Sequence, residues 1–120
     1  MDALMPTTDF MSIDQSSTKS VDDSSISIVI PCFNAIAYLE RTIDSLKQQE
    51  GVNVQIIVID DGSTDGSINL IKSLPSVDVW ESGPNKGACA ARNRGLSLAI
   101  FPYVMFLDAD DYLDTGTLIF

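Results

Sequence analysis

The segment Tyr103-Val-Met-Phe-Leu-Asp-Ala-Asp-Asp-Tyr-Leu113 is the strongest indicator of the fold, because a short apolar run ends directly in three carboxylates. A run of this length, rich in Val, Phe and Tyr and preceded by Pro102, predicts a buried strand. Asp108, Asp110 and Asp111 follow its C-terminal end, which is where an open α/β sheet binds its ligands. Like charges at this spacing repel one another, and a cation is the simplest group that neutralises them.

A second strand with the same kind of ending strengthens this interpretation. The apolar stretch 54–59 leads into Asp60-Asp61-Gly62-Ser63. An Asp-x-Asp triplet alone is a weak signal, since Asp also favours turns and helix starts. Two apolar strands that deliver acids to the same edge of one sheet are more specific, and they predict a binding site at that edge.

Strands and helices alternate through the rest of the folded part. The predicted strands are 26–30, 54–59, 77–80 and 103–107, and the predicted helices are 35–49, 65–74 and 87–100. This alternation predicts an α/β fold of Rossmann-like type, in which helices flank a mostly parallel sheet and the crossovers are right-handed.

The helices carry the patterns of helices packed on a sheet. In the first helix an apolar stripe is expected to face the sheet, and it consists of Ile36, Leu39, Ile43 and Leu46. Asn34 and Gly51 are expected to cap the two ends of this helix. In the third helix a row of small residues around Gly95 predicts a close approach to the sheet.

The chain divides into a tail and one folded part. Residues 1–25 are rich in Ser, Thr and Asp and lack a sustained apolar period, so they predict a disordered tail. The chain of 120 residues, 45% hydrophobic, suffices for one small core but not for two. The predicted domain therefore covers residues 26–120.

Composition excludes several kinds of partner and site. The net charge of -10, from 17 acidic and 7 basic residues without His, argues against nucleic acid or an anionic membrane surface as the main partner. Cys32 and Cys89 are predicted to be small buried residues in a reducing compartment, because they lack the neighbours of a zinc site or a disulfide framework.

The sequence also bears on where the protein is found. No apolar run approaches the roughly 20 residues of a membrane-spanning helix, and the N-terminus lacks the pattern of a signal peptide. A cytoplasmic location is therefore expected, with the membrane surface as an alternative for the full-length protein.

Motifs of other phosphate- and metal-binding folds are absent. The first strand runs into Pro31-Cys32-Phe33-Asn34, so it carries neither a P-loop nor a dinucleotide-binding fingerprint. A calcium loop counted from Asp61 would need Glu where Lys72 stands. A phosphorelay receiver would need more strands after Asp110. A fragment of a haloacid-dehalogenase-like phosphatase, which uses Asp-x-Asp with magnesium, remains an alternative.

Four segments, taken in order, resemble the successive motifs of family 2 glycosyltransferases, which have the GT-A fold. They are Ser27-Ile-Val-Ile-Pro-Cys-Phe-Asn34, Ile56-Ile-Val-Ile-Asp-Asp-Gly-Ser-Thr-Asp65, Asn85-Lys-Gly-Ala-Cys-Ala-Ala-Arg-Asn-Arg-Gly95 and Phe106-Leu-Asp-Ala-Asp-Asp111. Together they span nearly all of 26–114. The resemblance implies that 26–120 is the nucleotide-sugar-binding part of a GT-A domain that is incomplete at its C-terminus.

The resemblance also implies a function and roles for individual residues. The reaction would be an inverting transfer of a sugar from a nucleotide-sugar donor, usually UDP-linked, to a saccharide, lipid or protein acceptor with the help of Mn²⁺ or Mg²⁺. Pro31 and Phe33 would border the nucleoside, and Asp61 would accept a hydrogen bond from the base. Asp108 would face the ribose or the metal, and Asp110 would bind the metal at the diphosphate.

Further expectations concern the phosphates and the end of the chain. Arg92 would help to hold the phosphates. The catalytic base is expected beyond Phe120, so the chain alone would be inactive, and a non-catalytic module that binds nucleotide-sugar or metal remains an alternative. Leu118, Ile119 and Phe120 are expected to lack a packing layer, which predicts self-association.

Overall fold

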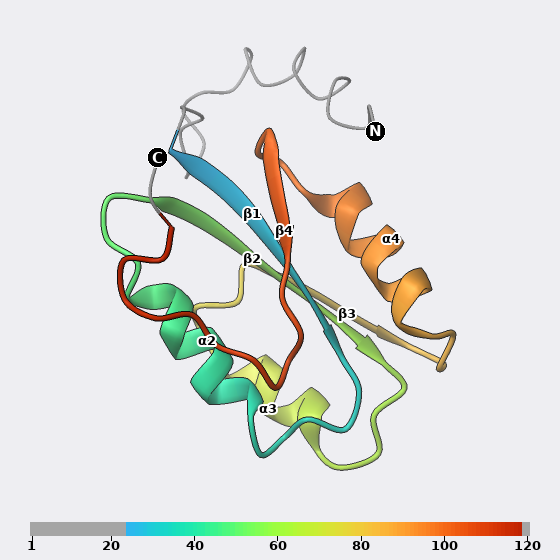
Figure 1. Ribbon diagram of the computed structural model, residues 1–120. Coiled ribbons are helices and arrows are strands. Elements are labelled where there is room, and N and C mark those ends of the chain that lie inside the picture. The colour runs from blue at the N-terminus through green and yellow to red at the C-terminus, as the bar shows by residue number, and fades with distance from the viewer. Residues whose placement is uncertain (1–23, 119–120) are drawn as a thin grey trace.

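The computed structural model describes residues 24–118, which form a four-stranded sheet with helices on both sides (Figure 1). The elements in chain order are β1 (Ser25–Cys32), α2 (Leu39–Lys47), β2 (Asn53–Asp61), α3 (Ser67–Ser73), β3 (Val79–Gly83), α4 (Ala88–Leu98) and β4 (Tyr103–Phe106). The strand order is β3-β2-β1-β4, and all neighbouring strands are parallel. The predicted α/β fold with parallel pairing is therefore confirmed.

The predicted tail falls almost entirely outside the described residues. Only Ser24 and Ser25 of the stretch 1–25 are described, and Ser25 already belongs to β1, where it pairs with Asn53. The first strand thus begins one residue before the predicted start.

The central strands are buried on both faces, so their side chains alternate between two hydrophobic clusters. Figure 1 shows α2 and α3 on one side of the sheet and α4 on the other. The larger cluster joins the sheet to α2 and α3 and includes Ile28, Ile30, Val58, Leu39, Ile43 and Ile71. The smaller cluster joins it to α4 and includes Val29, Ile57, Ile59 and Ala91. This two-sided burial explains why the strands read as nearly continuous apolar runs.

Helix α4 lies unusually close to the sheet. A Cβ atom at Gly95 would lie 2.2 Å from Cγ1 of Val29, which is fully buried in β1. Only glycine therefore allows this distance between helix and strand. The close approach predicted for this helix is confirmed.

The predicted start and caps of the first helix are wrong. Helix α2 begins at Leu39, and Ile36, which was placed on its buried stripe, is 41% exposed. The main-chain N–H of Ile36 instead donates to the Asp65 carboxylate at 3.1 Å. Asn34 has a φ of 49° and binds the loop after β2, while Gly51 lies beyond the C-cap at Gln48. Residues 35–38 form a turn ahead of the helix, in which the N–H groups of Tyr38 and Leu39 donate to the carbonyl of Ala35.

Other differences lie at element ends. The third strand begins at Val79 and not at residue 77, because the N–H of Val77 closes a turn by donating to the carbonyl of Leu74. Cys32 is buried as predicted, but Cys89 is exposed, since α4 turns it away from the sheet. Every helix between residues 24 and 118 is too short or too polar to span a bilayer.

The end of the described chain also differs from expectation. Leu118 is partly buried and packs against the larger cluster, so its predicted lack of a packing layer is wrong. Ile119 and Phe120 lie outside the described residues.

Candidate functional site

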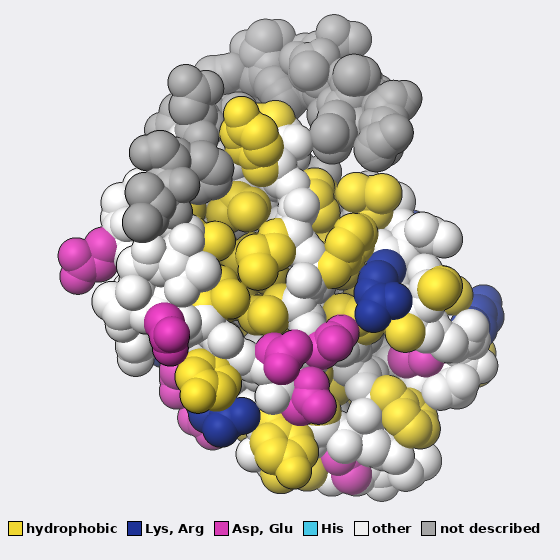
Figure 2. All heavy atoms as spheres, in the orientation of Figure 1, with side chains coloured by type: hydrophobic (Ala, Val, Ile, Leu, Met, Phe, Trp, Pro, Cys, Tyr) yellow, Lys and Arg dark blue, Asp and Glu magenta, His cyan; other side chains and the backbone are white. Residues whose placement is uncertain are grey.

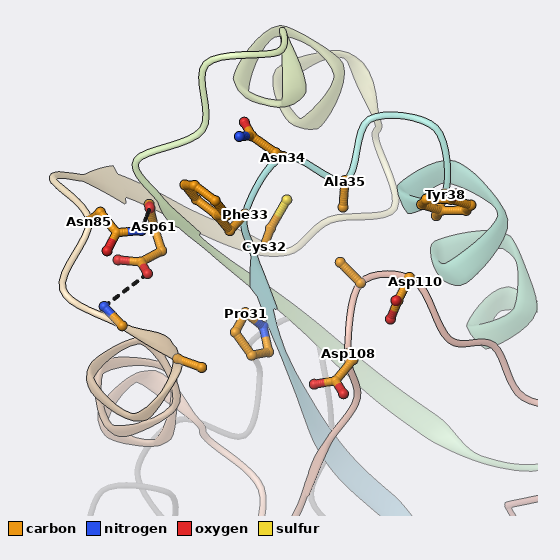
Figure 3. A pocket seen from close by; sticks show the side chains of 13 residues that line it. Pro31, Cys32, Phe33, Asn34, Ala35, Tyr38, Asp61, Asn85, Asp108 and Asp110 are labelled. Carbon is orange, nitrogen blue, oxygen red and sulfur yellow. Dashed lines mark hydrogen bonds between the residues drawn. The ribbon is translucent and has the colours of Figure 1, made fainter.

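A cleft of about 470 Å³ opens at the carboxyl ends of the strands. Its lining comes from the ends of β1 and β2, from the loops after β1, β3 and β4, and from the start of α4. The lining residues are Pro31, Cys32, Phe33, Asn34, Ala35, Tyr38, Asp61, Asn85, Gly87, Ala88, Asp108, Ala109 and Asp110. Figure 3 shows Asp61 and Asn85 on one side and Asp108 and Asp110 on the other, with Pro31 between them. The two acid-ending strands do meet at one edge, as their sequences predicted.

Asp61 connects the end of β2 to the start of α4. Its Oδ1 accepts the main-chain N–H of Lys86 at 2.6 Å, and its Oδ2 accepts that of Gly87 at 3.0 Å. The side-chain amide of Asn85 donates to the main-chain carbonyl of Asp61 at 3.1 Å. A carboxylate offers about four lone-pair sites, so Asp61 keeps capacity for a ligand. Its structural role was not foreseen from the sequence.

Asp60 points to the opposite side of the sheet and is buried. Its Oδ2 lies 3.2 Å from the main-chain nitrogen of Ser63 and from the hydroxyl of Ser82. Its Oδ1 has no hydrogen-bond partner within residues 24–118. Burial raises the pKa of the nearby Cys32 thiol. The Ser67 hydroxyl lowers this pKa by a smaller amount, and the charge of Asp60 raises it further. Cys32 therefore lines the cleft as a neutral thiol.

The loop after β1 is held by the loop after β2. The main-chain N–H of Asn34 donates to the Ser63 hydroxyl at 2.9 Å, and the Asn34 side chain accepts the N–H of Thr64 at 2.7 Å. Asp65 accepts from Ile36, and the Ser67 hydroxyl is the main cause that lowers the pKa of the Asp65 carboxyl. These contacts fix the part of the cleft that contains Phe33.

The acids after β4 form an exposed cluster. Asp108, Asp110 and Asp111 have carboxylate oxygens within 4.8 Å of one another. Figure 2 shows acidic side chains gathered beside a broad hydrophobic area on this face. Carboxylate oxygens are the hard ligands that Mn²⁺ and Mg²⁺ prefer, and a divalent cation would offset the repulsion among these charges. The donor set thus fits such a cation.

Two arginines of α4 have different partners. Nη2 of Arg92 lies 3.5 Å from Oδ1 of Asp108, so Arg92 reaches the acid cluster although it does not line the cleft. Arg94 instead forms two bonds of 2.7 Å with Glu81, and this pairing lowers the pKa of Glu81 and raises that of Arg94. Of these two, Arg92 is the one that contacts a residue lining the cleft, which is Asp108.

Some residues at the site were given no role from the sequence. Asn85, which opens the third motif, and Tyr38, which precedes α2, both line the cleft. The Arg41 guanidinium lies 4.5 Å from the centre of the Tyr112 ring and donates to the main-chain carbonyl of Asp110 at 3.4 Å. Arg41 and Asp110 are far apart in sequence, so this contact arises only in the fold.

The model of the family described as Glycosyl transferase family 2 matches residues 27–119. The chain belongs to glycosyltransferase family 2. An uncharacterized glycosyltransferase of Haemophilus influenzae is 42% identical over 92 residues, which cover 73% of this chain and 37% of that protein. The chain therefore spans little more than a third of the length of this relative. Family membership rules out the haloacid-dehalogenase alternative.

Two solved structures have a similar fold. S. aureus TarS 1-349 in complex with UDP has a TM-score of 0.72 and 26% identity, covering 78% of this chain and 30% of that chain. The mannosyltransferase PcManGT from Pyrobaculum calidifontis, in complex with GDP-Man and Mn²⁺, has a TM-score of 0.66 and 18% identity. The match covers 95% of this chain and 37% of that chain. The second likeness concerns the fold alone. The predicted GT-A fold is confirmed.

Proposed function

We propose that this family 2 chain forms the donor-binding part of an inverting glycosyltransferase that uses a UDP-linked sugar and a divalent cation. The observation that carries the proposal is the cleft itself, with the acceptor Asp61 on one side and the carboxylates of Asp108 and Asp110 on the other. A nucleoside diphosphate has a matching polarity, because its base donates hydrogen bonds at one end and its phosphates need cations at the other.

The nucleoside would lie between β1 and the start of α4. Phe33 lines the cleft and is 52% exposed, so its ring is free to contact the base or the ribose. The ring N–H of uracil can donate to a carboxylate oxygen of Asp61 that has a lone pair left. The binding of UDP by TarS, which is similar in fold and 26% identical, supports this choice of base.

The diphosphate would lie at the acid cluster. Asp108 and Asp110 would hold Mn²⁺ or Mg²⁺, which offsets the charge that develops on the leaving diphosphate as the glycosidic bond breaks. Arg92, at 3.5 Å from Asp108, would add a positive charge on the side of α4. Without these cations the carboxylates would repel a ligand of their own sign.

The first prediction is that UDP binds tightly only when a divalent cation is present. Calorimetric titration of UDP into the 120-residue chain with Mn²⁺ is expected to give clear binding, and excess chelator is expected to abolish most of it. Uridine, which lacks the phosphates, serves as the control. Its affinity should be the same with and without the chelator. Equal UDP affinity with and without Mn²⁺ would rule out the metal role.

A second prediction concerns the choice of base at Asp61. The parent is expected to prefer UDP to CDP, since the ring nitrogen of cytosine at this position accepts instead of donating. Asp61→Asn should reduce the ratio of the two affinities by about tenfold, the size expected for a hydrogen bond to a charged group. It should also destabilise the fold by about 1 kcal/mol, because a partly buried main-chain N–H of Lys86 or Gly87 loses its acceptor.

Asp65→Asn is the matched control for this substitution. Asp65 also accepts main-chain N–H groups but does not line the cleft. The Asp65→Asn variant should change the stability of the fold but keep the parent's ratio of UDP affinity to CDP affinity. If Asp61→Asn does the same, Asp61 is a structural residue only.

A further inference from the structure

Three polar side chains in and just after α2 are buried against the segment that follows β4. They are Thr42, Ser45 and Gln49, which are 0%, 7% and 6% exposed. Spacings of three and four residues place side chains on the same side of a helix. All three therefore face the same stretch of chain, and none of them lines the cleft.

These side chains bind the main chain from residue 109 onwards. The hydroxyl of Thr42 lies 2.7 Å from the carbonyl oxygen of Ala109 and 2.5 Å from that of Asp111. The Ser45 hydroxyl accepts the N–H of Leu113 at 3.1 Å. The last of the three, Gln49, binds both the carbonyl of residue 114 and the N–H of residue 118.

The segment has little regular structure of its own. Beyond Phe106, the last residue of β4, the described chain forms no helix or strand. The N–H of Leu107 still bonds to β1, and a turn bond of 3.0 Å joins the N–H of Asp111 to the carbonyl of Asp108. The path of the chain around Asp110 therefore depends on partners outside it, and Thr42 contacts the residues on both sides of Asp110.

We propose that Thr42 is a positioning residue for the cation site, and this inference rests on the proposed function. Asp108 directly follows the end of the sheet, whereas Asp110 lies in a segment held by α2. The Thr42 hydroxyl has one proton, which it can donate to the carbonyl of Ala109 or to that of Asp111. Either bond is to a residue next to Asp110, so Thr42 sets where the Asp110 carboxylate lies relative to Asp108. A cation needs both carboxylates at the right separation, and groups that hold the ligands in place strongly affect metal affinity.

The test compares Thr42→Val, which keeps the shape but loses the hydroxyl, with Thr42→Ser, which keeps the hydroxyl. Both are made in the 120-residue chain, and Mn²⁺ affinity is measured directly by titration. UDP affinity is measured with Mn²⁺ and with chelator, and thermal unfolding is followed in parallel. Thr42→Val is expected to weaken Mn²⁺ binding by about tenfold, the lower end of the effect of groups that orient metal ligands. Thr42→Ser should stay close to the parent.

Gln49→Ala separates positioning from a general loss of stability. It removes two hydrogen bonds to the same segment, but both lie after the acid cluster. It should lower the unfolding temperature while leaving Mn²⁺ affinity close to that of the parent. If Thr42→Val does not fold, Ser45→Ala replaces it, with a weaker loss of Mn²⁺ affinity expected because Leu113 is close to the cluster.

The outcomes distinguish this inference from the proposed function. If the parent binds neither Mn²⁺ nor UDP, the proposed function fails and the inference fails with it. If the parent binds both and Thr42→Val binds Mn²⁺ equally well, only the positioning role is wrong. The positioning role is also wrong if Mn²⁺ affinity falls in proportion to stability in all three variants, Thr42→Val, Ser45→Ala and Gln49→Ala.

Discussion

Asp110→Asn is expected to weaken Mn²⁺-dependent binding of UDP by about 100-fold or more. Asp110 both lines the cleft and belongs to the exposed acid cluster. The substitution keeps the size of the side chain but removes the charge and one of the oxygen ligands. Groups that only orient metal ligands already change metal affinity by about 10- to 100-fold, so the loss of a ligand should be at least as large. Calorimetric titration of UDP at fixed Mn²⁺ measures the effect.

Asp114→Asn is the matched control, because it removes the same charge from the same segment outside the cluster. Exposed charges beyond the ligands are largely screened at moderate ionic strength, so only a small change is expected. Both variants should unfold at temperatures close to that of the parent, since the cluster is exposed. Equal losses of UDP affinity in the two variants would mean that net charge, and not metal binding, controls the affinity.

Gly62→Ala is expected to destabilise the fold by about 3 kcal/mol, from left-handed backbone strain together with overpacking. Gly62 has a φ of 82°, and a Cβ atom there would lie 2.8 Å from the main-chain nitrogen of Asn85. Main chain cannot move aside as a flexible side chain can. The displaced loop contains the N–H groups that bind Asp61, so UDP affinity should fall as well. Urea denaturation and UDP titration measure the two effects.

Gly51→Ala isolates the contribution of the backbone conformation. Gly51 has a similar φ of 74°, but a Cβ atom there would meet nothing within 4 Å. It should therefore cost only about 1–2 kcal/mol of conformational strain and leave UDP affinity unchanged. If both alanine variants lose the same stability, the contact with Asn85 does not constrain the loop.

Much of the fold was predictable because its signals are local. Apolar runs alternating with helical periods predicted the parallel sheet, and the row of small residues around Gly95 predicted the close approach of α4. The strand endings at Asp61 and Asp108 predicted the edge where the cleft lies. Each of these features depends on a few neighbouring residues, so it can be predicted without knowing how the rest of the chain folds.

The tertiary structure decided which loops meet and what each polar group binds. Asp60 and Asp61 are neighbours in sequence, yet the pleat places them on opposite sides of the sheet. Asp60 binds Ser63 and Ser82, whereas Asp61 binds the start of α4. Likewise the loop before α2 is tied to Asp65, a residue distant in sequence, because the N–H of Ile36 donates to its carboxylate. Such hydrogen bonds join residues far apart along the chain, so they exist only once the crossovers have brought the strand ends together. The sequence alone therefore determined the sheet and its functional edge, while the position of each side chain in the cleft depended on the completed fold.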